Sequence, residues 1–198
     1  MQNKPDLAAL IGSRICHDLI SPIGAIGNGV ELMMMDRASA SPELALIAES
    51  VSSANARIRF FRVAYGMAGA DQRIARGEVT GILAGITHGG RLRIEWISGT
   101  DLDRREVKLA FLLLQCLESA MAYGGQIRVE ETASGWEILG EATRLRVEAP
   151  LWDMLAGQEA RDPVLAAQVQ FALVAAELRQ HQRRLVTEIG ETGIRLSW

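Results

Sequence analysis

A run of apolar residues spaced three and four apart dominates the first part of the chain. The run passes through Ile11, Ile15, Leu19, Pro22, Ile26, Val30 and Met33. This spacing matches one stripe of an α-helix with about 3.6 residues per turn. It predicts a helix over residues 6–35 that kinks at Pro22, because the stripe continues unbroken across the proline. A helix that breaks at Pro22 is the alternative.

The segment that follows favours a second helix, antiparallel to the first. Residues 36–42 are rich in helix breakers, Ser41 can cap a helix, and Pro42 suits its first position. A second stripe then runs to Gly66, a natural helix end. Two helices alone cannot bury two wide stripes. The sequence therefore predicts a hairpin over residues 1–68 that pairs with a second copy into a dimeric four-helix bundle, or is covered by the rest of the chain.

Residues 69–198 show a mixed pattern of strands and helices. Helices are expected at 106–123 and 163–180. Strand-like segments lie at 92–97, 126–131, 136–139, 144–148, 184–189 and 194–198, the last two as a closing hairpin. The predicted fold class is α+β, with the helical hairpin followed by a sandwich whose helices cover one face of a mixed sheet.

Composition excludes several classes of function. The net charge is −3 without a long basic run, so nucleic acid is not an expected partner. No apolar stretch reaches the roughly 18 residues of a membrane span, and no signal peptide is evident.

Cys16 and Cys116 are far apart, which favours reduced thiols and the cytoplasm. The histidines at 17, 88 and 181 lack metal-ligand spacing; His88 is expected in a turn and His181 at a solvated helix end.

His17 is the candidate reactive group. A neutral imidazole, abundant at pH 7 for a pKa of about 6.5, can attack phosphorus and carry a phosphoryl group covalently. At about 100° per residue, His17 lies nearly opposite the apolar stripe. Ile20 is either a docking contact or an ordinary exposed apolar residue. The candidate partner-docking residues share or adjoin the face of His17: Ser13, Ile20, Ser21 and Gly24.

Two charged neighbours are candidates for supporting His17. Asp18 can orient the imidazole or accept its proton, or it is a solvated residue on the flank of the helix. Arg14 can steady the charge of a phosphoryl group, or it forms a surface ion pair. A nucleophilic pair of Cys16 with His17 is disfavoured, because neighbouring side chains on a helix point about 100° apart.

The segment Cys16-His17-Asp18-Leu19-Ile20-Ser21-Pro22 resembles the phosphoacceptor box of sensor histidine kinases. In that box a histidine precedes a Glu or Asp, and a proline lies five residues beyond it. The hairpin resembles the dimerisation and phosphotransfer domain of these kinases, and residues 69–198 resemble their ATPase domain. The resemblance therefore implies a histidine-kinase ATPase-like fold for the second part.

The nucleotide motifs of those kinases do not carry over. Gln115 and Ser119 stand where the kinase helix has asparagines. Residues 138–145 lack the Asp-x-Gly-x-Gly box, and residues 157–163 form no glycine-rich lid. This combination is similar to the ChpT-type histidine phosphotransferases of alphaproteobacteria, as is the segment of residues 62–66.

That resemblance implies a homodimer with a degenerate ATPase-like domain that binds no ATP. It implies His17 as the phosphoacceptor, response-regulator receiver domains as donor and acceptor, no cofactor on this chain, and Mg²⁺ on the receiver. An active histidine kinase and a non-catalytic adaptor that binds receivers without carrying phosphate are the alternatives. The second domain either only stabilises the dimer or contacts the receiver beside His17.

Overall fold

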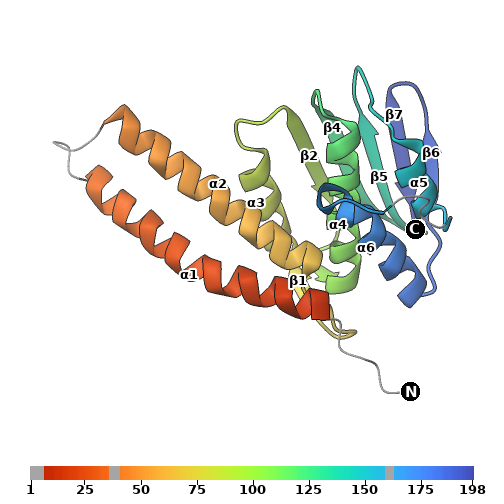
Figure 1. The fold of residues 1–198 in the computed structure, drawn as a ribbon, viewed down its shortest axis with the longest axis horizontal. Coiled ribbons are helices and arrows are strands. Elements are labelled where there is room, and N and C mark those ends of the chain that lie inside the picture. Colours follow the sequence, from red (N-terminus) through yellow and green to blue (C-terminus); the bar gives the residue numbers. More distant parts are fainter. Residues whose placement is uncertain (1–6, 36–40, 159–162) are drawn as a thin grey trace.

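The computed structural model describes residues 7–35, 41–158 and 163–198, with only the backbone at 7–11, 13–18 and 21–22. Two long helices, α1 (Leu7–Met35) and α2 (Pro42–Tyr65), form an antiparallel hairpin beside a layered α/β unit (Figure 1). Helix α1 continues through Pro22 in a gentle curve, so the alternative of a break there is wrong. The predicted cap of α2 is confirmed, because the backbone N–H of Leu44 donates to Oγ of Ser41 at 3.2 Å.

The second unit is built on a five-stranded mixed sheet. The sheet has the order β2-β4-β5-β7-β6; β2 and β4 are parallel, and the other neighbours are antiparallel. Strands β1 and β3 form a separate antiparallel pair. Helices α3, α4 and α6 lie on one side of the sheet in Figure 1. The α+β class is therefore confirmed, with these elements: β1 (Arg73–Ala75), α3 (Arg76–Thr87), β2 (Leu92–Ile97), β3 (Asp101–Asp103), α4 (Arg104–Ala120), β4 (Gly125–Thr132), β5 (Gly135–Glu141), α5 (Ala149–Leu155), the 3-10 turn Ala166–Gln168, α6 (Val169–Gln180), β6 (Val186–Ile189) and β7 (Gly193–Ser197).

Helix α4 is the centre of the core. Its N-terminus is capped by Asp103, whose Oδ1 accepts from the backbone N–H of Arg105 at 2.7 Å. Every residue from Val107 to Leu117 is buried, because the helix packs against the sheet, α2 and α6 at once. Lys108 is buried in α4 but forms an ion pair with Glu177 of α6, which compensates the cost of removing both charges from water.

Four sequence-based expectations for the second unit differ from the structure. Residues 144–148 form a loop, because the N–H of Arg146 donates to the carbonyl of Ala120 at the end of α4 instead of joining the sheet. The last helix begins at Val169, later than expected, and the helix expected to reach residue 123 ends at Ala120. His181 follows α6 as expected, but its ring packs beside Glu177, with Nε2 3.4 Å from Oε2, and is not fully solvated.

Helix α2 lies between α1 and the second unit and is firmly attached to the latter. The ring of Phe60 is buried and stacks on Phe111 of α4, with centroids 4.7 Å apart. The guanidinium of Arg104 donates to the carbonyls of Val63 at 2.9 Å and Arg62 at 3.0 Å. These carbonyls are among those that the end of a helix leaves without intrahelical partners. The hairpin is thus held to α4 by both aromatic packing and helix capping.

Candidate functional site

The candidate site lies on the first half of α1. The backbone there is helical, which keeps position 17 and Gly24 two turns apart on one face. The side chains of Ser13, Arg14, His17, Asp18 and Ser21 lie outside the described residues. Ile20 is half-buried. A Cβ atom at Gly24 would meet no atom within 4 Å, so the space above this residue is open.

Two glycines show which side of α1 faces α2. A Cβ atom at Gly12 would lie 3.4 Å from Cβ of Tyr65, and one at Gly27 would lie 3.4 Å from Cγ1 of Val51. The two helices therefore approach each other closely at both ends of the contact. At about 100° per residue, position 17 lies about 110° around α1 from this side. Position 17 is thus on a flank of the hairpin and not in its seam.

The opposite flank of α1 carries exposed apolar side chains. Leu19, Ile26 and Met33 are 44%, 53% and 55% exposed, although they belong to the stripe that the sequence predicts to be buried. The second unit does not cover them, because α2 lies between it and α1. The alternative in which the rest of the same chain buries this stripe is therefore wrong for these three residues. A row of exposed apolar side chains of this kind is typical of a protein–protein contact.

The residues that replace the kinase asparagines make contacts within the chain. Oε1 of Gln115 accepts from the hydroxyl of Tyr65 in α2 at 2.5 Å. Burial raises the pKa of Tyr65, so this hydroxyl keeps its proton and remains a donor. Ser119 accepts from Nε2 of Gln170 in α6 at 3.1 Å. Both α4 side chains therefore connect helices of the fold.

Gly140, a buried glycine near the end of β5, allows close packing. A Cβ atom at Gly140 would lie 3.0 Å from Sδ of Met121 and 3.2 Å from Cδ2 of Leu117. Strand β5 therefore presses directly on the C-terminal part of α4. Beyond it, the N–H of Ala142 donates to the carbonyl of Thr192 at 2.9 Å, which fixes the course of the chain. Gly140 therefore allows β5 and α4 to pack closely, and the side chains of Met121 and Leu117 fill the space beside it.

Other chemically reactive groups offer no second site in the part of the chain that the structure describes. No group of three or more His, Cys, Asp or Glu side chains gathers there in a way that suits a metal ion. Cys116 is buried in α4, and burial raises the pKa of its thiol well above the usual value. None of the described helices is long and apolar enough to span a membrane.

Helix α3 was not predicted from the sequence, although it contacts the hairpin directly. A Cβ atom at Gly85 would lie 2.7 Å from Cβ of Ala56 in α2, and Glu78 pairs with Arg62 at 3.2 Å. The signal was present in the spacing of three, one and three residues that marks one helix face. The apolar residues on that face are Val79, Ile82, Leu83 and Ile86.

Comparisons with known proteins agree with this architecture. The family described as "Histidine phosphotransferase C-terminal domain" matches residues 76–193. A "Protein phosphotransferase ChpT" of Brucella abortus is 33% identical over 180 residues, which cover 87% of this chain and 86% of that protein. A solved bacterial phosphotransferase overlays with a TM-score of 0.70 and 27% identity, over 100% of this chain and 97% of the other. The chain therefore belongs to the histidine phosphotransferase family of ChpT-type proteins.

Proposed function

We propose that this protein is a histidine phosphotransferase of a phosphorelay. His17 would take a phosphoryl group from the aspartyl phosphate of one response-regulator receiver domain and pass it to the aspartate of another. The observation that supports this proposal most strongly is the placement of position 17 on a flank of α1, away from the exposed apolar stripe. A receiver can approach that flank without competing with whatever covers the stripe.

The proposed reaction is a reversible in-line transfer. The lone pair on Nε2 of a neutral His17 forms the N–P bond while the P–O bond to the donor aspartate breaks, and the departing carboxylate keeps the electron pair. The proton on Nδ1 of the phosphorylated ring can then pass to a carboxylate such as Asp18 or to water. Arg14 is the proposed cation of α1 beside the phosphoryl group. The receiver would bring its own Mg²⁺, so this chain needs no cofactor.

We infer further that the ATPase-like unit binds no nucleotide. Gln115 and Ser119 are engaged with Tyr65 and Gln170, and Gly140 packs directly on α4. These contacts involve both side chains that stand where the kinases have asparagines, and Met121 and Leu117 fill the space beside Gly140. The phosphoryl group would accordingly come from another protein, in the cytoplasm, and not from ATP.

A transfer assay tests this function. Incubation with a receiver phosphorylated on aspartate should move label to this protein as an acid-labile, base-stable phosphoramidate, mapped to His17 by mass spectrometry. Incubation with labelled ATP should give none, and calorimetry should detect no ATP binding. Label from ATP would indicate an active kinase. A stable complex with the receiver but no label on His17 would indicate the non-catalytic adaptor.

We also propose that the protein is a homodimer whose hairpins form a four-helix bundle. Leu19, Ile26 and Met33 are exposed at intervals of seven residues along one flank of α1, and Ile47 of α2 is 48% exposed. A seven-residue interval is the repeat of helices that pack side by side in a bundle. A second copy of the same surface would bury these residues through a two-fold axis.

Replacing Ile26 with aspartate should therefore convert the dimer to a monomer. A charge in the middle of the apolar contact would have to be desolvated twice, once in each subunit. Light scattering should give twice the 21.6 kDa of the chain for the wild type and a single chain mass for Ile26→Asp. Val186→Asp, which alters an apolar residue of similar exposure on β6, should stay dimeric. A wild type of single chain mass would contradict the dimer.

A further inference from the structure

The register of the hairpin shows which residues of α2 lie level with position 17. In the two contacts Gly12–Tyr65 and Gly27–Val51, the residue numbers add to 77 and 78. The helices are antiparallel, so position 17 lies level with residues 60 and 61 of α2. Arg59 and Arg62 are the charged residues of α2 on either side of that level.

The flank of α2 that carries Arg59 is the one beside α3. Ala56 touches Gly85 of α3, and Arg62 binds Glu78 of α3. Arg59 lies midway between these two residues in a row with a spacing of three, which follows one side of a helix. Arg57, by contrast, forms an ion pair with Glu118 of α4 on the other side of α2.

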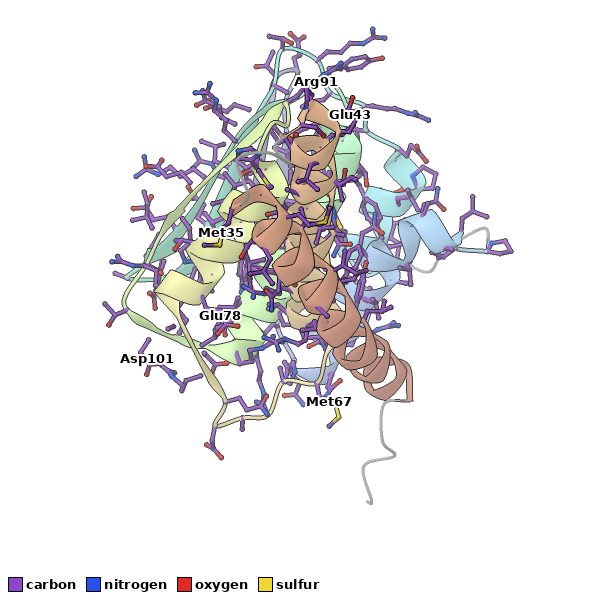
Figure 2. All side chains as sticks on the ribbon, turned by 90° about the vertical axis from the view of Figure 1, so that its left-hand side faces the viewer. Met35, Glu43, Met67, Glu78, Arg91 and Asp101 are labelled. Carbon is purple, nitrogen blue, oxygen red and sulfur yellow. The ribbon has the colours of Figure 1, made fainter. Side chains whose placement is uncertain are left out.

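Position 17 lies on the same flank of the hairpin as Arg59. Viewed from the N-terminus of α1, successive residues of this right-handed helix turn clockwise. Position 17 is therefore displaced from the seam of the hairpin toward the side on which α3 lies. Met35, five turns beyond His17 on the same face of α1, provides a check. Figure 2 shows Met35 and Glu78 on the same side of the hairpin. The positions of His17 and Arg59 are therefore on neighbouring helices, at nearly the same level and on the same flank.

Among the side chains that the structure describes, none forms a hydrogen bond or ion pair with Arg59. Its side chain is exposed, although it lies between two residues that touch α3. The α2–α3 contacts Ala56–Gly85 and Arg62–Glu78 place Arg59 level with Gly81 and the buried Ile82 of α3. A Cβ atom at Gly81 would meet nothing within 4 Å. Adjacent packed helices are about 8–10 Å apart, a distance that an arginine side chain largely spans. A phosphoryl group on His17 thus comes within reach of this guanidinium.

We propose that Arg59 binds the phosphoryl group as it moves to and from His17, which deepens the proposed function and rests on it. A guanidinium can donate two parallel hydrogen bonds to phosphoryl oxygens and offset the charge that develops on them during transfer. Arg59 forms and breaks no covalent bond; the N–P and P–O bonds are exchanged as described above. The site of transfer would then combine both helices of the hairpin.

Kinetics of the Arg59→Ala variant test this assignment. Removing a preorganised donor to developing charge typically lowers the rate about 10²-fold. We expect a fall of that size in kcat for transfer from a phosphorylated receiver, with KM changed less than about threefold. Arg59→Lys should recover part of the rate, because it keeps the charge but loses the paired donors. Arg57→Ala, which alters an arginine two residues away on the other side of α2, should behave as wild type.

A second readout separates contact with the phosphoryl group from a structural role. In the ³¹P NMR spectrum of the phosphorylated protein, a guanidinium contact should lower the pH midpoint of the phosphohistidine titration, and Arg59→Ala should raise it relative to Arg57→Ala. Equal rates and equal midpoints in the two alanine variants would overturn the role of Arg59 while leaving phosphotransfer intact. A wild type that takes no label would overturn both proposals.

Discussion

Replacing His17 with glutamine should reduce phosphoryl loading from a phosphorylated receiver by at least about 10³-fold, which is the loss of the covalent acceptor itself. Glutamine keeps a polar side chain and suits a helix interior, so α1 should persist. The measurement is the amount of acid-labile phosphate on the protein after a fixed time. Circular dichroism of the variant should match that of the wild type.

The other two histidines supply matched controls for this result. His88 is exposed in the turn after α3, and His181 follows α6 beside Glu177. The variants His88→Gln and His181→Gln should both load phosphate at the wild-type rate. Label that survives in His17→Gln, or that disappears in either control, would contradict the assignment of the acceptor.

Replacing Phe60 with alanine should lower the free energy of unfolding by about 3–5 kcal/mol, the usual cost of removing a buried phenylalanine side chain. The ring is buried between α2 and α4 and stacks on Phe111 at 4.7 Å, so its loss leaves a cavity where the hairpin joins the second unit. Urea denaturation followed by circular dichroism at 222 nm measures the difference.

Phe61 is the control for this second substitution. It is only half-buried, and its ring stacks on Tyr65 of the same helix at 5.3 Å and not on a ring of α4. Phe61→Ala should therefore cost clearly less than Phe60→Ala. Equal losses would contradict the larger contribution assigned to the buried ring of Phe60.

The long-range periodicity of the hairpin made it predictable from the sequence. The stripe of α1 runs over about six turns, and the cap of α2 depends only on Ser41 and its near neighbours. The prediction of a strand at residues 144–148 was wrong for the opposite reason. Their alternation is local, but their conformation is decided by one bond from Arg146 to Ala120, which are 26 residues apart in sequence. Helix α3 was missed because its four apolar residues form a short pattern among glycines.

The candidate site could be predicted only in part. The choice of His17 follows from its neighbours and from the phase of α1, and both can be read along one helix. The proximity of position 17 to Arg59 cannot be read along one helix, because 42 positions separate the two residues and only the register of the hairpin brings them level. The closeness of Gly12 to Tyr65 sets that register, and it depends on how the two helices pack in three dimensions.

The hydrogen bond between Tyr65 and Gln115 limits which residues position 115 can accept. Restoring an asparagine at position 115 would shorten the side chain that accepts from Tyr65 at 2.5 Å, and would weaken the joint between the hairpin and α4. A larger residue at position 140 would likewise disturb the packing, because Met121 and Leu117 already fill the space beside Gly140. Substitutions at positions 115 and 140 would therefore have to be compensated elsewhere in the fold before they could persist. The same contacts that stabilise the fold thus restrict how its sequence can change.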